Sequence, residues 1–269
     1  MKGIRTINNS KKNNNNEYIL EAIGIKKHFG GVYALDNVDL RLKYNEILGI
    51  VGDNGAGKST LIKIISGVLK RDEGDIYFEG KKIDIDKPKD ASKLGIETVY
   101  QDLSLVDLQN VPFNIFLGRE NTYGGLLKYI GLLNDRKMLN ESLKLLDRLN
   151  INLGDLRKPT RDYSGGQRQA VAISKAIYWG TKVAILDEPT AALGVNESRK
   201  ALELIKMLKE KSKISIIIIS HNMQHMFSVV DRIMVLRRGK LITIQDARKV
   251  TASDIVKFIT GADKVIERV

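Results

Sequence analysis

The 269-residue sequence contains no cysteine, which excludes disulfide bonds and thiolate metal sites and is consistent with a reducing compartment. It also has no long hydrophobic run, because the longest strongly apolar stretch, ISIIIIS at 214–220, is far shorter than the roughly 20 residues that span a bilayer. The N-terminal stretch MKGIRTINNS lacks the apolar segment of a signal peptide. We therefore expect a cytosolic protein that does not cross a membrane.

Acidic residues are too few to balance the basic ones, and the formal net charge is +12. Several cations precede the first acidic residue, Glu17, and residues 8–16 read NNSKKNNNN, a low-complexity segment with little to bury. We expect residues 1–16 to form a disordered tail. Elsewhere, dispersed Lys and Arg could bind nucleic acid or an anionic membrane, but they more often form a solvated face, and we expect no direct nucleic-acid contact.

Short apolar runs, each followed by a loop with polar residues, indicate an α/β sheet. In the first such unit, ILGIV at 47–51 is typical of a buried strand, and TLIKIISGVL at 60–69 is typical of an amphipathic helix. The loop between them, GDNGAGKS at 52–59, matches the phosphate-loop pattern G-x-x-x-x-G-K-[ST]. Strand, loop and helix together are the context that this motif requires.

The residues of this loop suit a nucleoside triphosphate. Gly52, Gly55 and Gly57 allow the backbone to approach phosphates closely and to turn successive N–H groups inward. Lys58 supplies a charge for the β and γ phosphates, and the Ser59 hydroxyl can bind Mg2+. We therefore predict that the chain binds a nucleoside triphosphate.

A second unit, KVAILDEPTAAL at 182–193, has an apolar strand that ends in Asp187 and Glu188. Residues just beyond the strands of a parallel sheet line the ligand crevice. We therefore predict that Asp187 holds Mg2+ through water and that Glu188 polarises the water that attacks the γ-phosphate. Two adjacent acids at a strand end are more often ordinary loop residues, and the phosphate loop upstream favours the functional interpretation.

A third unit carries a histidine at the same edge, because the predicted strand 214–219 leads into His221. The imidazole of His221 could hydrogen-bond the γ-phosphate and orient Glu188 or the attacking water. A single histidine is usually structural, and the position after a core strand is what distinguishes this one. His28 and His225 have no such setting, and we expect both on the surface.

A further stretch, RDYSGGQRQAVAISKA at 161–176, places Ser164, Gly165 and Gly166 directly before an Ala- and Ile-rich run typical of a helix. The backbone N–H groups at a helix start can bind an anion. The chain would then contain two phosphate sites, although one nucleotide requires only the upstream loop.

Together these motifs resemble the ATP-binding cassette family. The set comprises the phosphate loop, YQDLSL with Gln101, YSGGQ at 163–167, ILDEP at 185–189 and SHNM with His221, in the family's order and spacing. The resemblance implies a single cassette domain at about residues 17–262, followed by a tail at 263–269. The implied fold is α/β: a P-loop NTPase (RecA-like) core with a mainly parallel sheet, an antiparallel β subdomain, and a helical signature subdomain at about residues 102–162.

The branch of the family is indicated by NIFLGRE at 114–120, TAALGV at 190–195 and the closing FITGAD. These stretches resemble the single-cassette ATPases of bacterial monosaccharide importers for ribose, xylose, galactose or fructose. The resemblance implies an ATPase, peripheral on the cytoplasmic membrane face, that energises a permease served by an extracytoplasmic sugar-binding protein. Many relatives carry two cassettes in about twice this length. The sugar itself cannot be inferred, because no residue of such a subunit contacts it.

The resemblance also assigns roles to residues. Phe29 aligns with the aromatic that stacks on adenine, with Tyr33 as a second candidate and a plain core role as the alternative. Gln101 senses the γ-phosphate and Mg2+, while its loop, to about Glu120, contacts the membrane subunit. Nucleotide binding is assigned to Phe29, Gly52, Asn54, Gly55, Gly57, Lys58, Ser59, Thr60, Ser164, Gly165, Gly166 and Gln167. Mg2+ binding is assigned to Ser59, Gln101 and Asp187, and catalysis to Glu188, His221 and Gln101.

The resemblance explains the second phosphate site through a head-to-tail homodimer. ATP held by Lys58 of one subunit would be covered by the Ser164–Gly166 helix start of the other. The sequence departs from the family at Tyr163, where leucine is usual, and at Gly194, where an aspartate couples the two sites. Because Gly194 cannot make that contact, we expect the two nucleotide sites to communicate differently from those of other family members. We expect hydrolysis at each site to be less affected.

Two other functions compete with sugar import. A soluble cassette ATPase acting on nucleic acid or ribosomes is favoured by the basic charge, but such proteins generally have tandem cassettes or long insertions. An ordinary P-loop kinase would have no use for YSGGQ or His221. A polytopic membrane partner that co-purifies with the chain would distinguish sugar import from the soluble cassette ATPase.

Overall fold

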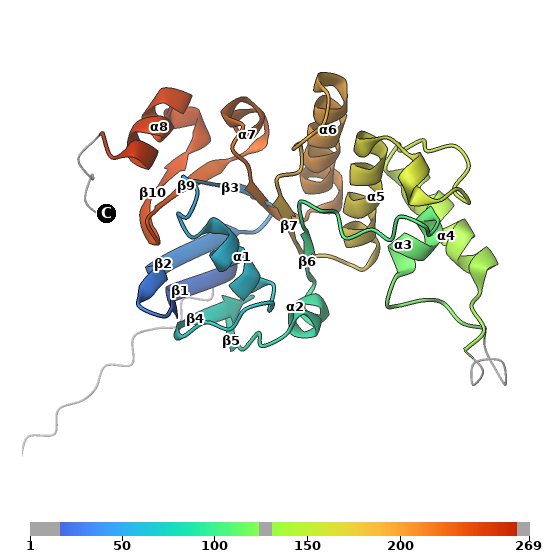
Figure 1. Ribbon diagram of the computed structural model, residues 1–269, viewed down its shortest axis with the longest axis horizontal. Coiled ribbons are helices and arrows are strands. Elements are labelled where there is room, and N and C mark those ends of the chain that lie inside the picture. The colour runs from blue at the N-terminus through green and yellow to red at the C-terminus, as the bar shows by residue number, and fades with distance from the viewer. Residues whose placement is uncertain (1–16, 124–130, 263–269) are drawn as a thin grey trace, which may run out of the picture.

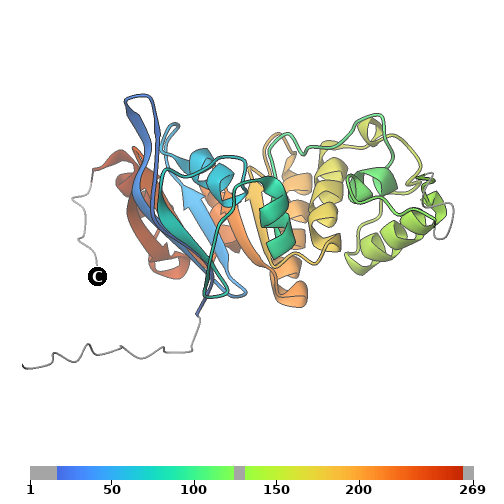
Figure 2. The same ribbon diagram turned by 90° about the horizontal axis from the view of Figure 1, so that it is seen from below.

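A computed structural model describes residues 17–123 and 131–262 of the chain. The tails predicted at 1–16 and 263–269 therefore lie outside the described residues. Within the described part, two sheets occupy one half of the molecule, and the helices α3 and α4 occupy the opposite end (Figure 1). Figure 2 shows the same separation from below, with α5 and α6 between the two ends.

The smaller sheet is antiparallel and has the strand order β2-β1-β4-β5. Residues of one face of β1 and β2, such as Leu20, Ala22, Leu40 and Leu42, are fully buried, as expected for a sheet packed on one side. The strands are β1 (Tyr18–Phe29), β2 (Val32–Lys43), β4 (Glu73–Phe78) and β5 (Lys81–Ile83).

The larger sheet is parallel except for its last strand and has the order β10-β9-β3-β8-β7-β6. All residues of β3 and β8 are buried, because helices or the smaller sheet cover both faces of these central strands. The strands are β3 (Ile47–Val51), β6 (Ile96–Val99), β7 (Val183–Asp187), β8 (Ser215–Ile219), β9 (Arg232–Arg237) and β10 (Lys240–Asp246). The predicted α/β class, with its parallel sheet and antiparallel subdomain, is confirmed.

The helices begin at residues that favour helix starts. Asn110, Asn134 and Asn222 accept backbone hydrogen bonds at the starts of α3, α4 and α7. The helices are α1 (Lys58–Ile65), α2 (Pro88–Leu94), α3 (Val111–Phe116), α4 (Asp135–Arg148), α5 (Gly165–Tyr178), α6 (Val195–Ser212), α7 (Met223–Val229) and α8 (Ala252–Thr260), with short 3-10 helices at 160–162 and 247–249. We call α3 and α4, which pack on α5 and on each other, the helical lobe.

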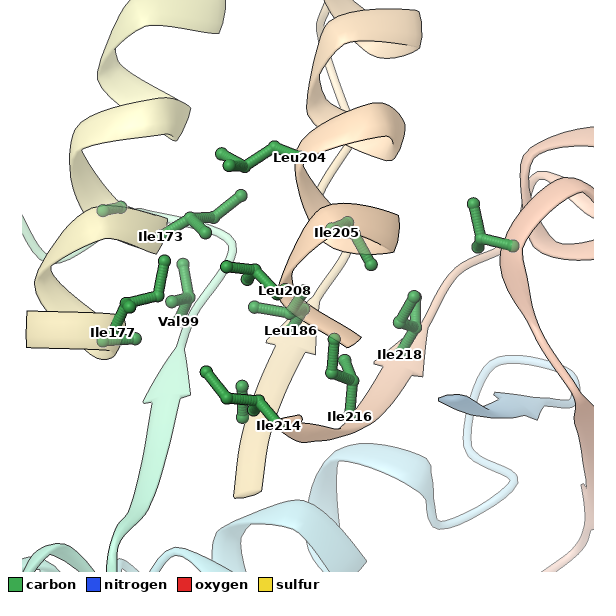
Figure 3. Packing of buried hydrophobic residues seen from close by; sticks show 14 of the residues in the cluster. Val99, Ile173, Ile177, Leu186, Leu204, Ile205, Leu208, Ile214, Ile216 and Ile218 are labelled. Carbon is green, nitrogen blue, oxygen red and sulfur yellow. The ribbon is translucent and has the colours of Figure 1, made fainter. Parts of the chain in front are cut away.

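Two hydrophobic clusters cover the two faces of the larger sheet. Because side chains alternate along a strand, Ile216 and Ile218 of β8 join one cluster, while Ile217 and Ile219 join the other. Figure 3 shows the first cluster, where residues of α5 and α6 meet the strands. The labelled members are Val99, Ile173, Ile177, Leu186, Leu204, Ile205, Leu208, Ile214, Ile216 and Ile218. This core fixes the position of α5, whose first turn carries the YSGGQ motif, against the sheet.

Candidate active site

The phosphate loop lies between the buried strand β3 and the start of α1. Gly52 has φ 151° and Gly57 has φ 102°, conformations that L side chains rarely adopt. A Cβ at Gly52 would overlap the Leu236 carbonyl oxygen, and one at Gly57 would lie 2.6 Å from the Ala34 carbonyl oxygen. Close packing against β9 and β2, as well as the backbone angles, therefore requires glycine at both positions.

Lys58 is the first residue of α1, and only 7% of its surface is exposed. Its ammonium donates hydrogen bonds to the carbonyl oxygens of Gly52 (2.6 Å) and Asp53 (2.9 Å). Burial lowers the pKa of Lys58, and the nearby carboxylates of Glu188, Asp53 and Asp187 oppose that change. The loop thus surrounds a buried cation that has acidic groups within electrostatic reach.

The other predicted residues of the loop are accessible to a ligand. Asn54, Gly55 and Ser59 are exposed, and Thr60 is half-buried. Asn54 and Gly55 line a hollow of about 390 Å³ together with residues of the β9–β10 turn and the end of α8. The side chains of Asn54, Ser59 and Thr60 are therefore not buried in the core and can reach a ligand.

Asp187 and Glu188 lie at the end of β7, and β8 separates this strand from β3. The Glu188 N–H donates to the Ile219 carbonyl oxygen (2.9 Å), which fixes the residue against β8. Glu188 has φ 51°, an uncommon value for a residue other than glycine and one that is found at functional sites. Burial raises the pKa of both carboxyl groups, with Lys58 opposing the change at Asp187 and His221 opposing it at Glu188.

His221 and Glu188 are in contact, because Nε2 of the imidazole lies 3.3 Å from Oε1 of the carboxylate. The Glu188 side chain is 14% exposed and that of His221 is 58% exposed, so the pair joins a mostly buried carboxylate to an accessible ring. Among the residues that the structure describes, no donor meets hydrogen-bond geometry for Glu188 Oε1. This oxygen is suited to accept a hydrogen bond from a water molecule.

The other two histidines have different surroundings. His28 is exposed, as predicted, and its Nδ1 lies 2.7 Å from a carboxylate oxygen of Asp72. His225 is half-buried, and its Nδ1 lies 2.9 Å from the Thr190 hydroxyl. His225, also expected on the surface, is thus only partly exposed, because its ring contacts the loop that follows β7. Sequence reasoning also missed Thr190, which is only 8% exposed.

Gln101 lies in the exposed turn after β6. Val99 pairs with Leu186 in neighbouring strands, so the chain reaches Gln101 just past the level of Asp187, at the same edge of the sheet. Within the described ranges Gln101 has no hydrogen-bond or ionic partner. The structure thus places Gln101 at the expected edge without joining it to the Glu188–His221 pair.

Both adenine-stacking candidates are exposed at the β1–β2 turn, Phe29 by 54% and Tyr33 by 59%. The alternative of a plain core aromatic is therefore wrong for both. The Lys27 ammonium lies 5.6 Å from the centroid of the Phe29 ring. The Ala34 carbonyl oxygen, next to Tyr33, lies beside Gly57 of the phosphate loop, so the backbone of this hairpin passes along the loop.

The YSGGQ motif forms the start of α5. The Ser164 hydroxyl accepts a hydrogen bond from the Gln167 N–H (3.3 Å), and the Gln167 side-chain oxygen accepts one from the Ser164 N–H (3.0 Å). This reciprocal pair is a capping box, which the S-x-x-Q spacing could have indicated. A Cβ at Gly165 or Gly166 would contact Leu193 or Glu197, so the motif packs closely against the start of α6.

The YSGGQ residues and the phosphate loop line different hollows. Ser164, Gly166 and Gln167 face a cavity of about 810 Å³, which also contacts Glu197 and Lys200 of α6. The phosphate-loop residues line hollows beside α8 and His221. The single chain therefore does not bring its two predicted phosphate-binding elements onto one ligand.

The acidic groups limit how a metal ion could bind. The described residues contain no group of three or more His, Cys, Asp or Glu side chains that could enclose a metal. Mg2+ commonly uses one or two carboxylates together with phosphate oxygens and water. The Asp187 carboxylate and the Ser59 hydroxyl fit that kind of site.

The two departures from the family pattern have clear local structures. Tyr163 is 8% exposed, and its hydroxyl donates to the Asp155 carbonyl oxygen (2.6 Å), so it packs as expected. Gly194 immediately precedes α6, and its N–H donates to the Glu197 side chain (3.4 Å). Val195, the next residue, is highly exposed.

None of the helices in the described part of the chain combines the length and apolarity that a bilayer span requires.

Three relatives found by comparison with known proteins are all named as ATP-binding proteins of sugar import. The chain is 47% identical over 243 residues to a xylose/arabinose import ATP-binding protein of Sulfolobus acidocaldarius, covering 90% of this chain and 94% of that protein. It is 45% identical to a fructose import ATP-binding protein of Rhizobium meliloti, covering 91% and 95%. It is 41% identical to a ribose import ATP-binding protein of Caldanaerobacter subterraneus, covering 92% of this chain but 48% of that longer protein.

Solved structures agree with the fold. A nucleotide-free ATP-binding cassette from an ABC transporter has a TM-score of 0.75 at 28% identity, with 93% of this chain and 98% of that chain covered. A dimeric ATP-binding cassette bound to ADP and phosphate has a TM-score of 0.71 at 25% identity, covering 85% and 99%. The family model described as ABC transporter matches residues 35–191, which include the phosphate loop, the YSGGQ motif and Glu188. The chain belongs to the ABC transporter family, as an ATP-binding cassette.

Proposed function

We propose that this chain is the ATP-hydrolysing subunit that energises a membrane permease for uptake of a sugar, a monosaccharide, from the cytoplasmic face of the membrane. One observation carries the ATPase role: Glu188, in contact with His221, lies within electrostatic reach of the buried Lys58 of the phosphate loop. The sugar assignment is supported by the names of relatives matched over nearly their whole length, which specify xylose/arabinose and fructose import. The partners are then a permease and an extracytoplasmic sugar-binding protein.

Nucleotide binding begins at the phosphate loop. Lys58 and the backbone N–H groups of Gly52–Gly57 bind the β and γ phosphates, and Asn54, Ser59 and Thr60 line the same site. Ser59 and Asp187 hold Mg2+, which neutralises phosphate charge when bound, and Gln101 approaches from the end of β6. Phe29 or Tyr33 stacks on the adenine ring, since both rings are exposed on the hairpin beside the loop.

Glu188 and His221 act on the attacking water. Burial raises the pKa of Glu188, which makes it a stronger proton acceptor than an ordinary carboxylate. Its Oε1, which accepts no hydrogen bond from the described residues, orients the water toward the γ-phosphate, and the exposed His221 ring donates to the phosphate or to Glu188.

The complete site is formed by two copies of the chain. Ser164, Gly165, Gly166 and Gln167 of one copy cover the nucleotide held by the other, through the N–H groups at the start of α5. The separate cavities of the two elements in one chain support this arrangement, as does the dimer reported for a cassette bound to ADP and phosphate. Because Gly194 replaces the usual aspartate, the two sites communicate less directly in this dimer.

The permease is contacted by the chain segment after Gln101. We infer that residues from about 102 to 162 act as a helical subdomain and that the loop to about Glu120 docks on the permease. Packing of α3 and α4 on α5 supports this division, because motion of the helical lobe would carry the YSGGQ motif with it. Closing and opening of the dimer would then move the permease between its two states.

The transport assignment is tested by isolating the chain together with its membrane partner. A polytopic permease should co-purify, and reconstituted vesicles should accumulate a labelled monosaccharide only when ATP is supplied on the cassette side. The variant Lys58→Ala, which removes the phosphate-binding cation, is the matched control for uptake. Tight binding of nucleic acid without any membrane partner would instead favour a soluble cassette ATPase.

A further inference from the structure

Arg119, from the NIFLGRE stretch, contacts parts of the chain that are distant in sequence. Its guanidinium donates to Glu97 Oε1 of β6 (2.8 Å) and to the Ser92 hydroxyl of α2. The same guanidinium lies 4.8 Å from the centroid of the Trp179 ring, directly after α5. Ser92 also donates to Glu97 (2.7 Å), so the carboxylate is held from two sides. One side chain therefore joins the edge strand of the larger sheet to the end of the YSGGQ helix.

Trp179 is held on its other sides by the helical lobe. Its indole N–H donates to the Ile115 carbonyl oxygen (3.1 Å) in α3. The Phe116 ring, which is fully buried, packs edge-on against Trp179 with centroids 5.6 Å apart and against Tyr178 at 4.6 Å. The end of α5 and helix α3 are thus rigidly joined at this point, and Arg119 attaches both of them to the sheet.

The electrostatic surroundings make this contact stronger than an ordinary surface ion pair. The side chains of Arg119 and Glu97 are 36% and 23% exposed, and the guanidinium is stacked on an aromatic face as well as ion-paired. Burial lowers the pKa of Lys175, one turn earlier in α5, while Glu97 opposes that change. If the Glu97 carboxylate were removed, Arg119 and Lys175 would be neighbouring cations with no negative charge between them to offset their repulsion.

The contact lies at the opposite end of α5 from Ser164. The helix has 14 residues and is therefore about 20 Å long, so a small rotation at Trp179 becomes a larger displacement at Ser164. The segment that contains Gln101 connects β6 to α3, and the Arg119 contact joins the chain on either side of this segment. A group that fixes α3 and α5 on β6 therefore fixes the angle at which the YSGGQ motif is presented.

We propose that Arg119 is a positioning residue: with Glu97, Ser92 and Trp179 it forms a clasp that sets the orientation of the helical lobe and α5 relative to the sheet, and thereby places Ser164 against the nucleotide of the partner copy. This proposal rests on the proposed function of the chain as a dimeric ATPase.

The clasp can be tested by distance measurements on the full chain, which has no natural cysteine to interfere. Spin labels at Lys81→Cys on β5 and Asn140→Cys on α4, both exposed, report the orientation of the lobe. Arg119→Ala should broaden the distance distribution or shift it, and Arg119→Lys, which keeps the charge without the planar fork, should restore it in part. The control Lys182→Ala removes a comparable ion pair with Glu79 and a contact with the Phe78 ring, and should leave the distance unchanged.

Steady-state ATPase kinetics provide the second readout. Arg119→Ala should lower kcat about ten-fold or more, because a displaced Ser164 misplaces the covering half of the site. Binding of a fluorescent ATP analogue to the monomer should stay within about two-fold, since the phosphate loop is untouched. Equal distances and kcat in Arg119→Ala and Lys182→Ala would overturn the clasp, and so would a loss of nucleotide binding that parallels the loss of kcat.

Failure of the clasp and failure of the proposed function are distinguishable. The label distances are measured on the nucleotide-free monomer and need neither hydrolysis, nor a dimer, nor a permease. If the otherwise natural chain hydrolyses no ATP, the proposed function fails, while an altered distance in Arg119→Ala still supports the clasp as the element that orients the lobe. An unaltered distance in an active chain would reject the clasp alone.

Discussion

The phosphate loop and the YSGGQ helix start are both predicted to bind phosphate, yet they are built in different ways. The loop is surrounded by its own chain: Gly52 and Gly57 pack on neighbouring backbone, and Lys58 lies near Glu188. The start of α5 satisfies the N–H groups of Ser164 and Gln167 with its own capping box, and it faces a separate cavity. The loop is completed by contacts within its own chain, whereas the helix start is capped without a ligand and, in the proposed dimer, acts on the nucleotide of a second chain.

The largest effect should come from neutralising the proposed base. Glu188→Gln should lower ATP turnover by about a hundred-fold or more, because the water loses its proton acceptor, while nucleotide binding at Lys58 persists. An ATP-bound dimer should accumulate and be visible by size-exclusion chromatography with multi-angle light scattering. Glu210→Gln, at an exposed position of α6, is the control. Turnover near the natural rate in Glu188→Gln would remove Glu188 from the mechanism.

A mixed dimer tests whether the two elements meet across an interface. Lys58→Ala disables the loop of one chain, and Ser164→Arg blocks the helix start of the other. Each variant alone should be inactive, but each mixed dimer should regain about half of the activity of a natural dimer, because one of its two composite sites keeps both intact halves. The control is a mixture of two differently tagged Lys58→Ala chains. If mixed dimers form and remain inactive, the two elements do not act in trans.

The parts of this site that could be predicted from the sequence are those with local patterns. The strand at 47–51 and the start of α5 after Ser164 were predicted correctly from apolar runs and glycine positions. The helix predicted at 60–69 spans Lys58–Ile65 instead, and it ends just before Gly67, whose φ of 74° is the left-handed conformation that commonly stops a helix. The glycine is a local signal for this end, which the apolar pattern alone overran.

Contacts between distant segments were not predictable in this way. His225 bonds to Thr190, which is 35 residues away, and Arg119 pairs with Glu97 across the turn that contains Gln101. No periodicity links these residues, and only the folded sheet brings them together. The roles of Gln101 and Phe29 came from family resemblance, and they remain predictions.

The glycines of the phosphate loop offer a smaller effect that sharpens the contrast. Gly52→Ala should destabilise the fold by about 3 kcal/mol or more, because the new Cβ overlaps Leu236 backbone and the φ of 151° is strained. Gly55→Ala should cost about 1 kcal/mol, since that residue has φ 77° but its Cβ meets open space. Urea unfolding of both variants checks the order. Equal losses would mean that close packing does not select glycine in this loop.

The smallest effect concerns the pH dependence of stability. Burial raises the pKa of Glu188 above its ordinary value of 4.5, so the folded chain keeps the proton at a pH where the unfolded chain releases it. Stability contributed by this proton is present below pH 4.5, is lost as the pH rises toward the folded pKa, and stays lost above it. Glu188→Gln removes the charged form, so its melting temperature should exceed that of the natural chain at neutral pH.

The excess should shrink as the pH falls toward 4.5, because both chains then carry a neutral side chain at this position. Thermal melts without nucleotide over this range measure it, with Glu210→Gln as the exposed control. The same comparison for Ser164→Ala should show the opposite sign at every pH, a loss of about 1 kcal/mol from the missing helix cap. An excess that does not vary with pH would show that a change in packing, rather than the buried charge, separates Glu188→Gln from the natural chain. In that case the Glu188 region would differ from the YSGGQ region in its packing contacts, and not in the free energy needed to bury a charged carboxylate.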